Sequence, residues 1–419
     1  MRHESILRRS ALLLAALGCL GTNPLPTQGE DMSYREAVGF LGRHTQVVEL
    51  QGAEGARVAV CPGWQGRVMT STCGGPEGPS FGYINRPYVE AGKHNPHFAN
   101  FGGEDRMWLS PEGGPFSLWF KPAAPQNLDY WFTAPALNEG AWGVAARGED
   151  FCRMEQPMQL EIASATRFEL NVTREVRLLS AGDLPGLFGR GAAAMIGAPG
   201  LKMVGYETAN TLTNRGAAMT REKGLISIWI LGMLNASPQT VVIVPYKPGD
   251  PGCLGPVVKS DYFGPVPPER LKILPEAILF RADAECRSKI GTSQRRARNV
   301  LGSIDYRSGV LTLVQFTMPD DPTQHPYMNN MWGVPQPEPY VGDVANSYND
   351  GPAAPGKPRM GNFYEIESLS PAGQLETGGS LVHRHRTVHI QAAPAVLQGL
   401  AREVLGVDLA EVRRQMLGQ

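Results

Sequence analysis

Short stretches in which apolar and polar residues alternate recur along this 419-residue chain, from about residue 45 to residue 392. Alternation with a period of two turns one face of a strand to a core and the other to solvent. Glycine (49) and proline (35) fall in nearly every gap between these stretches, as tight turns require. Many strands without alternating helices predict an all-β fold, a large antiparallel sandwich, and exclude a chain of βαβ units.

The expected strands are spread over the whole middle of the chain. They cover residues 57–60, 66–70, 116–120, 158–162, 168–172, 225–231, 240–244, 277–280, 310–316, 362–367 and 380–390. Residues 188–201, rich in glycine and alanine, predict a loop or a short helix. Residues 395–416 carry apolar side chains at helical spacing, with Asp408 as a helix N-cap, and predict two short amphipathic helices. The simplest organisation is one β domain over residues 41–393 and a helical tail over residues 394–419.

The first residues have the pattern of a targeting signal. Three arginines within nine residues precede an apolar run that is too short to span a bilayer, and small residues follow. We therefore expect residues 1–19 to be a bacterial secretory signal peptide and residues 20–40 to be a tether. Residues 16–19, Ala-Leu-Gly-Cys, also resemble a lipobox, in which Cys19 would carry a lipid anchor. The alternative is an ordinary signal peptide with Cys19 near or inside it, so the expected location is the periplasm or the membrane surface.

Composition excludes several classes of protein. Lys and Arg (39) balance Asp and Glu (40), which argues against a nucleic-acid-binding surface. No later stretch has 18 consecutive apolar residues, so we expect no transmembrane helix and membrane contact only through Cys19. No Cys or His spacing typical of zinc occurs, and we expect buried thiols with room for one disulfide. The cysteines after Cys19 are Cys61, Cys73, Cys152, Cys253 and Cys286.

The richest polar segment spans residues 93–112 and surrounds the glycine pair at 102–103. Carboxylates and an arginine beside a tryptophan suit a sugar, because charged groups bind hydroxyls while the indole covers the apolar face of the ring. The alternative is an ion pair of Arg106 with Asp105 or Glu104 that fixes a loop. The polar and aromatic members of the segment are His94, His97, Asn100, Glu104, Asp105, Arg106, Trp108 and Glu112.

A second segment, residues 320–350, shows no convincing strand. Long loops inside compact domains are usually functional or disordered, and its aromatic residues argue against disorder. Trp332 and Asn349 are therefore candidate walls of a ligand pocket. The alternative is a surface Ω-loop packed by its own aromatic side chains.

Two further segments carry titratable pairs. Residues 363–367, read as a strand, place Glu365 and Glu367 on one face, where mutual repulsion would raise the pKa of one carboxyl and suit it to proton transfer. His383 and His385 share a face of the strand over residues 380–390 and could transfer protons or contact a sugar. A metal site is disfavoured because no third ligand is evident. In both cases the alternative is an ordinary solvated strand.

The order of these segments resembles a known superfamily. Residues 100–112, Asn-Phe-Gly-Gly-Glu-Asp-Arg-Met-Trp-Leu-Ser-Pro-Glu, resemble the glycine-rich segment of exported bacterial proteins related to galactose mutarotase, an aldose 1-epimerase. Residues 206–214 resemble its mid-chain strand with two asparagines, and residues 363–371 and 381–387 resemble its closing acidic and histidine-bearing strands. The resemblance implies a β-supersandwich with a carbohydrate-facing cleft and, in catalytic members, neither a metal nor an organic cofactor.

The resemblance also implies residue roles. In catalytic members a glutamate near the end of the domain takes the anomeric hydroxyl proton, and Glu367 or Glu365 matches it by position. A histidine after the mid-chain asparagine protonates the ring oxygen, but Arg215 follows Asn214 here. Either His383, His385 or His97 then supplies the acid from another strand, or the chain performs different sugar chemistry, or it only binds a sugar.

Three hypotheses follow from the sequence. The first is an exported enzyme that performs cofactor-free epimerisation, mutarotation or a related elimination on a sugar or glycoside. Glu367 would be the base, Glu365 would tune it, a histidine would be the acid, and Arg106 would hold hydroxyls with Asp105. The second is a non-catalytic carbohydrate-binding protein of the cell envelope on the same fold. The third is a structural envelope protein, which leaves the polar segment 320–350 unexplained.

Overall fold

The computed structural model describes residues 32–198 and 200–418, and these residues form one compact unit. The expected signal peptide and Cys19 lie outside the described residues, as does most of the expected tether. The prediction of a tether is wrong for its last part, because helix α1 (Tyr34–Gly42) is capped by Ser33 and buries Tyr34 and Phe40. The folded domain therefore begins before residue 41.

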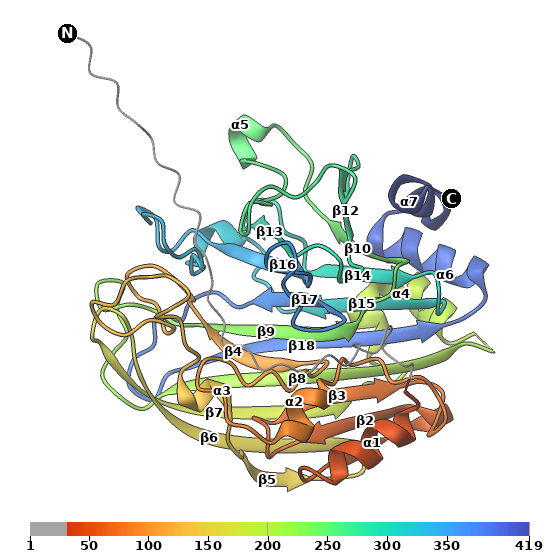
Figure 1. Ribbon diagram of the computed structural model, residues 1–419. Coiled ribbons are helices and arrows are strands. Elements are labelled where there is room, and N and C mark those ends of the chain that lie inside the picture. Colours follow the sequence, from red (N-terminus) through yellow and green to blue (C-terminus); the bar gives the residue numbers. More distant parts are fainter. Residues whose placement is uncertain (1–31, 199, 419) are drawn as a thin grey trace. The chain divides into compact units, whose positions relative to one another are not determined.

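All strands named here pair antiparallel, as the sequence predicts, and they build three sheets (Figure 1). The small sheet has the order β1 (Val48–Gln51), β2 (Arg57–Cys61), β3 (Arg67–Thr72). The five-stranded sheet has the order β13 (Ser288–Ser293), β16 (Asp343–Asn349), β17 (Phe363–Leu369), β9 (Ser227–Asn235), β4 (Arg106–Ser110). The ten-stranded sheet has the order β11 (Leu271–Ile273), β12 (Ala277–Arg281), β10 (Thr240–Pro245), β14 (Val300–Asp305), β15 (Val310–Phe316), β18 (Ser380–Gln391), β8 (Lys202–Asn214), β7 (Arg167–Leu178), β6 (Phe151–Glu161), β5 (Gly143–Arg147).

Alternation along the strands divides the apolar side chains between two cores. In β10, Val242 and Val244 belong to the core shared with the five-stranded sheet, whereas Val241 and Ile243 pack in the core that holds the helices. The helices of that second core lie over one part of the ten-stranded sheet (Figure 1). They are α4 (Leu184–Ile196), α6 (Pro394–Leu400), the π-helical turn Ala401–Leu405 and α7 (Leu409–Leu417). The predicted helical tail is thus present, and it packs as part of the domain.

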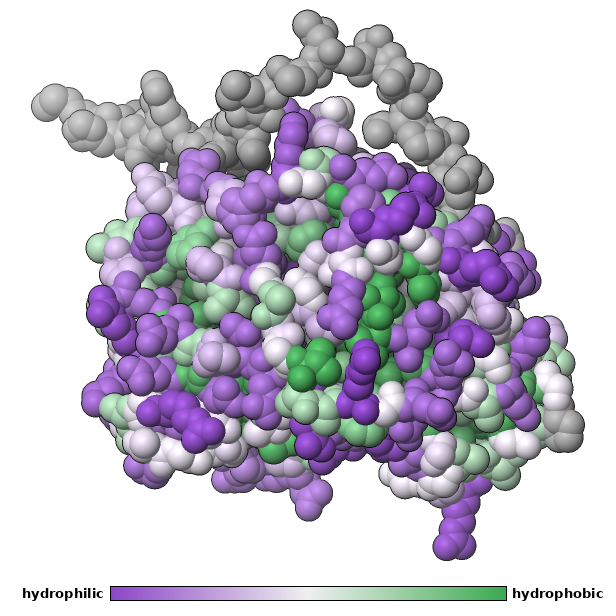
Figure 2. Space-filling view, turned by 90° about the horizontal axis from the view of Figure 1, so that it is seen from below, coloured by the Kyte–Doolittle hydropathy of each residue, from purple (hydrophilic) through white to green (hydrophobic). Residues whose placement is uncertain are grey.

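The remaining helices of the described residues are short and stand in connections between strands. They are the α-helices α2 (Arg86–Ala91), α3 (Pro135–Asn138) and α5 (Pro251–Leu254) and two 3-10 turns, Ala53–Gly55 and Pro322–Gln324. Seen from below, the surface is mainly hydrophilic, with apolar residues interspersed among polar ones (Figure 2). Strand β6 shows the same mixture of polar surface and apolar core, because its residues alternate between buried and exposed over most of its length.

Two local predictions were wrong. Residues 116–120 form no strand, because the Ser117 hydroxyl donates to the Glu112 carbonyl and accepts from the Trp119 amide, so local bonds replace a ladder. The segment 320–350 contains strand β16 in an interior position of the five-stranded sheet. Asn and Asp are uncommon in strands, and their presence in β16 concealed it. Helix α4 resolves the choice for residues 188–201 in favour of a helix over most of that stretch.

Candidate functional site

One face of the five-stranded sheet packs on the ten-stranded sheet, and the other face carries charged side chains. Its inner face packs on the ten-stranded sheet, where the Tyr364 hydroxyl lies 2.7 Å from the Ser303 hydroxyl of β14. Residues directly opposite in an antiparallel pair share a face. Glu367 pairs with Leu231, and Leu231 with Arg106, so Glu367 and Arg106 lie on the same face, two strands apart. That face, opposite to the one with Tyr364, is called the outer face below.

Arg106 joins one carboxylate and one aromatic ring on the outer face. Its Nη2 donates to Glu365 Oε1 at 2.7 Å, and its guanidinium carbon lies 4.0 Å from the centroid of Trp108. The Arg106 side chain is only 4% exposed, and its Nε and Nη1 have no hydrogen-bond partner among the described residues. Two guanidinium donors on this face are therefore buried without a partner among the described residues, and such groups are costly to leave unpaired.

Lys289 holds the second carboxylate. Its Nζ lies 2.9 and 2.8 Å from the two Glu367 oxygens, and the Trp229 indole donates to Glu367 at 2.9 Å. The ammonium also lies 4.9 Å from the Trp229 ring centroid and 5.7 Å from that of Tyr262. The Glu367 side chain is thereby buried and held by donors at both oxygens.

The electrostatics of the two carboxyls follow from these contacts. Burial raises the pKa of Glu365 to about 7, against the opposing effect of Arg106 and with a further rise from Glu367. Interaction with Glu367 raises the pKa of Lys289 above its ordinary value, although burial alone would lower it. A carboxyl whose pKa is raised in this way is suited to proton transfer.

Glu112 completes the cluster from the loop after β4. Its Oε1 accepts from the Trp131 indole at 2.9 Å. Burial raises the pKa of Glu112, while Lys289 and the side chains of Trp131 and Trp332 lower it. Both tryptophans are partly exposed, whereas Trp108 and Trp229 are buried beneath the two cations. The aromatic surface that can meet a ligand thus belongs to the loops.

The two polar segments of the sequence meet at this point. Asn330 Oδ1 accepts from the Glu112 amide at 2.8 Å and from the Ser110 hydroxyl at 2.7 Å. Trp332 packs against Phe120, with 5.7 Å between their ring centroids. The loop after β4 and the loop before β16 therefore lie side by side and form one wall. Beside this wall lies a groove of about 370 Å³, lined by Gly114, Pro115, Gln126, Gly333, Val334, Pro335 and Gln336.

The two predicted histidines lie elsewhere. His383 Nε2 and His385 Nδ1 each lie 2.8 Å from the Ser368 hydroxyl, which belongs to the inner face of β17. Glu367 is on the opposite face of the same strand, because successive residues alternate. Burial lowers the pKa of His383 to about 3 and that of His385 to about 4. The structure thus does not bring these histidines together with the carboxylates, and the proposed histidine acid is corrected.

Asp105 is also separated from Arg106. It is fully buried, bonded to the guanidinium of Arg174, and accepts from the Thr208 hydroxyl at 3.0 Å. Glu104 instead accepts from Ser71 and lies 2.8 Å from His389 Nε2. Neither predicted pairing with Arg106 occurs. Asp105 belongs to a buried network between the sheets and not to the outer face.

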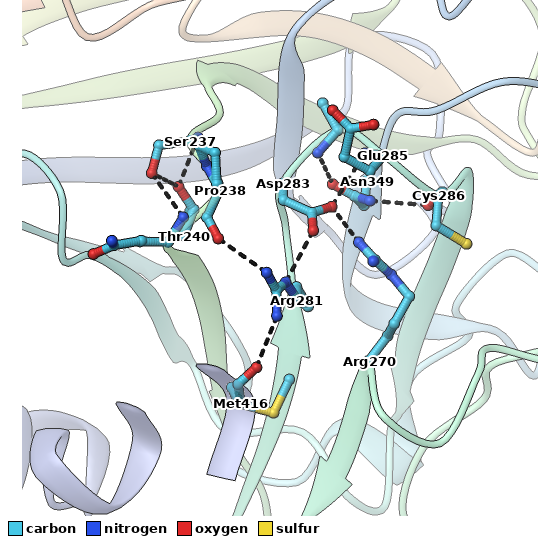
Figure 3. A network of polar contacts seen from close by, with 12 residues as sticks. Ser237, Pro238, Thr240, Arg270, Arg281, Asp283, Glu285, Cys286, Asn349 and Met416 are labelled. Atoms are coloured by element: carbon cyan, nitrogen blue, oxygen red, sulfur yellow. Dashed lines mark hydrogen bonds and ion pairs between the residues drawn. The ribbon is translucent and has the colours of Figure 1, made fainter. Parts of the chain in front are cut away.

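The Asn349 side chain binds the backbone of a neighbouring turn (Figure 3). Its Oδ1 accepts from the Ala284 amide at 2.8 Å, and its Nδ2 donates to the Cys286 carbonyl at 2.9 Å. The neighbouring Asp283 binds Arg270 and Arg281, and Arg281 reaches the Met416 carbonyl of α7. Asn349 therefore fixes the turn after β12, and its expected role in a pocket wall is corrected.

The other predicted contacts lie around the site. His97 is exposed and its Nδ1 lies 2.8 Å from the Trp131 carbonyl. Asn100 is 8% exposed, and its Oδ1 has no hydrogen-bond partner in the described part of the chain. Sequence reasoning missed Lys289 and Trp229 and gave Glu112 no role. Trp229 was hidden in an apolar run, and Lys289 stands in no recognisable pattern.

Further features bear on other classes of function. In the described ranges 32–198 and 200–418, no helix is long and apolar enough to cross a bilayer, and no three His, Cys, Asp or Glu side chains cluster as metal ligands would. The five cysteines of those ranges are free thiols, and Cys61, Cys73 and Cys152 are buried.

Comparisons with known proteins place the chain in context. The solved structures that it resembles include a candidate aldose 1-epimerase from Escherichia coli K12, at 10% identity and a TM-score of 0.47, covering 83% of this chain and 99% of that one. They also include a galactose mutarotase-like protein from Lactobacillus casei ATCC 334, at 8% identity and a TM-score of 0.45, covering 83% of this chain and 100% of that one. No curated protein matches the sequence. A profile described as a family of unknown function, DUF6786, matches residues 32–416, and the chain belongs to that family.

Proposed function

We propose that this protein binds a sugar or glycoside on the outer face and catalyses a cofactor-free acid/base reaction there, such as exchange at the anomeric carbon. The observation that carries the proposal is the convergence of Arg106, Lys289, Glu365 and Glu367 on one face, beside the loop carboxyl of Glu112. Buried charged groups with free donors, beside partly exposed tryptophans, suit the hydroxyls and apolar faces of a sugar. The sequence resemblance to galactose mutarotases agrees with this chemistry.

In this proposal Glu365 is the base and Glu367 is a positioning residue. The Glu365 side chain is 8% exposed, whereas Glu367 is 0% exposed and both of its oxygens are held by Lys289. Glu365 takes the proton of the anomeric hydroxyl, and Arg106 holds Glu365 in place through Nη2. This reverses the roles that the sequence favoured for the two glutamates.

A non-catalytic carbohydrate-binding protein is the second candidate. Two observations favour it: Arg215, not a histidine, follows Asn214, and Arg106 and Lys289 themselves cover Trp108 and Trp229. Such a protein would use the same outer face and lack proton transfer by Glu365. Turnover therefore separates the two candidates, while binding alone does not.

We further propose that the protein is exported, with Cys19 as a lipid anchor, on the strength of residues 1–19 alone. The test is to express the full chain and its Cys19→Ala variant in a bacterium and to fractionate the cells. The proposal expects the wild-type protein in the membrane fraction with the mass of a lipidated chain, and the variant without that mass.

The test of sugar binding is a thermal-shift screen of the purified protein with neutral monosaccharides, uronates and amino sugars. A ligand that binds only the folded state raises the melting temperature by mass action. A sugar that stabilises the wild type but not Arg106→Met supports the site. The exposed variant Glu376→Gln is the matched control and should respond like the wild type. If none of the sugars shifts the melting temperature, the carbohydrate proposal fails.

A further inference from the structure

We propose that Glu112 is the catalytic acid of this site, the group that exchanges a proton with the ring or leaving-group oxygen of the bound sugar. The inference rests on the proposed function and supplies the acid that the buried histidines cannot be. It is drawn from the position of Glu112, its bonding partners and its accessibility.

The backbone at Glu112 is fixed from two sides. The Asn330 side chain accepts from its amide, and the Ser117 hydroxyl donates to its carbonyl. Ser117 belongs to the same loop as Glu112, whereas Asn330 belongs to the second polar segment. The backbone of Glu112 is therefore fixed where the two polar segments of the chain meet. A group fixed by its main chain keeps its position while its side chain gains or loses a proton.

The partners of the carboxyl distinguish Glu112 from the other two glutamates. Glu365 and Glu367 each bind a cation directly, Arg106 and Lys289 respectively. The Glu112 carboxyl is instead held by a neutral donor, the Trp131 indole. A carboxyl that is not committed to an ion pair can carry a proton without breaking one. Taken as a whole residue, Glu112 is also less buried than Glu365 and Glu367.

The charged groups around Glu112 come from three strands. Lys289 of β13 and Arg106 of β4 are the nearby cations, and Glu367 of β17 is the nearby anion. Burial and Glu367 favour the neutral acid, while Lys289 and the indole groups favour the carboxylate. These opposing influences leave the group able to give and to retake a proton.

The proton count closes within the site. Glu112 gives its proton to the ring oxygen while Glu365 takes the proton of the anomeric hydroxyl, so the bond between the anomeric carbon and the ring oxygen breaks and an open-chain aldehyde forms. The ring then closes on the other face of the aldehyde. In this step Glu365 gives its proton back to the carbonyl oxygen, and the hydroxyl that becomes the ring oxygen gives its proton back to Glu112. No oxidant, reductant or further reactant is needed.

The first arm of the test needs no sugar. The indole N–H signal of Trp131 is followed by NMR in the ligand-free protein between pH 4 and pH 9, in the wild type and in Glu112→Gln. The proposal expects a titration step in the wild type that is absent in Glu112→Gln and present in Glu376→Gln. A wild-type indole signal that shows no step attributable to Glu112 overturns the proposal, whatever the protein does to sugars.

The second arm uses α-D-glucose and α-D-galactose as probes and follows anomer exchange against pH. Glu112→Gln should lower the rate about 100-fold or more, leave the thermal shift by the same sugar in place, and remove the fall in rate at high pH. Trp131→Phe removes a donor that stabilises the carboxylate, so that fall should move to higher pH. Wild-type rate and profile in Glu112→Gln overturn the role of Glu112 alone. A wild type that neither binds nor turns over any sugar overturns the proposed function and this role with it.

Discussion

At the scale of single residues, Lys289 and Glu367 form an almost fully buried ion pair on the outer face. The carboxylate is 0% exposed and the lysine side chain 10%, and the pair is joined at both oxygens. A buried pair of this kind need not stabilise the fold relative to apolar residues, but removing one partner leaves an uncompensated charge. Such a pair is therefore weak evidence of net stabilisation, although each partner depends on the other.

Lys289→Met tests that statement. We expect the variant to lose about 3–5 kcal/mol of unfolding free energy in urea, and the double variant Lys289→Met/Glu367→Leu to recover most of it. Arg153→Met, which removes an exposed ion pair with Glu175, is the control and should cost less than about 1 kcal/mol. A double variant that is no more stable than Lys289→Met would contradict the account.

His385 allows a prediction about pH at the same scale. Its pKa is about 4 in the folded protein against 6.5 as the ordinary value, so the unfolded chain binds its proton first. The neutral imidazole therefore contributes stability that is present above pH 6.5 and lost as the pH falls toward 4. Glu365, with its raised pKa, acts in the opposite direction between its ordinary value of 4.5 and about 7, so the comparison must be made between variants.

The measurement is urea unfolding of the wild type, His385→Gln and the exposed control His44→Gln at several values between pH 4 and pH 7. The free-energy difference between the wild type and His385→Gln should shrink as the pH falls, because only the wild type loses the benefit of a neutral histidine. His44→Gln should run parallel to the wild type. A constant difference for His385→Gln would contradict burial of that imidazole.

At the scale of elements, β17 shows what a strand pattern can and cannot predict. Alternation alone placed Glu365 and Glu367 on one face, and the structure agrees. It could not show that this face is the outer one, nor that His385 of β18 meets β17 from the inner side through Ser368. Which face of a strand meets which neighbour depends on the sheet order, and no local pattern contains that information.

The same limit explains the elements that sequence reasoning missed. Strand β16 pairs with β13 and β17, and its Ser347 hydroxyl donates to the Glu365 carbonyl at 2.7 Å. Its polar side chains are satisfied by these neighbours, so they tolerate an interior strand that their composition disfavours. Lys289 became significant only because β13 lies in the same sheet as Glu367.

Helix α7 carries a prediction at the scale of elements. Leu409, Val412 and Met416 are buried in the core that it shares with the ten-stranded sheet, and each contributes about 1.5–3 kcal/mol. Truncation after Val407 should lower the melting temperature sharply and expose apolar surface to a fluorescent dye. Truncation after Leu417 keeps the three side chains and should leave the melting temperature unchanged. Equal stability of both truncations would show that α7 is not part of the domain.

At the scale of the whole molecule, the antiparallel sandwich and the helical tail follow from the sequence, while the site follows only in part. Arg106 and the two glutamates were recognised because their residue types and spacing suggest sugar chemistry. Asp105, Asn349 and the two histidines have the same residue types, yet each is bound within the protein. Folding brings Glu112, Lys289 and Trp131 together from separate segments, and this juxtaposition defines the site.

The most direct test of the central claim is the rate of anomer exchange of freshly dissolved α-D-glucose and α-D-galactose, followed by polarimetry with wild type, Glu365→Gln and Glu376→Gln. The account predicts acceleration by the wild type and by Glu376→Gln, and a loss of about 100- to 10,000-fold in Glu365→Gln, with sugar binding retained. Acceleration that is unchanged in Glu365→Gln would contradict the assignment of the base. Binding without acceleration by the wild type would make the protein a carbohydrate-binding protein and not an enzyme for these sugars.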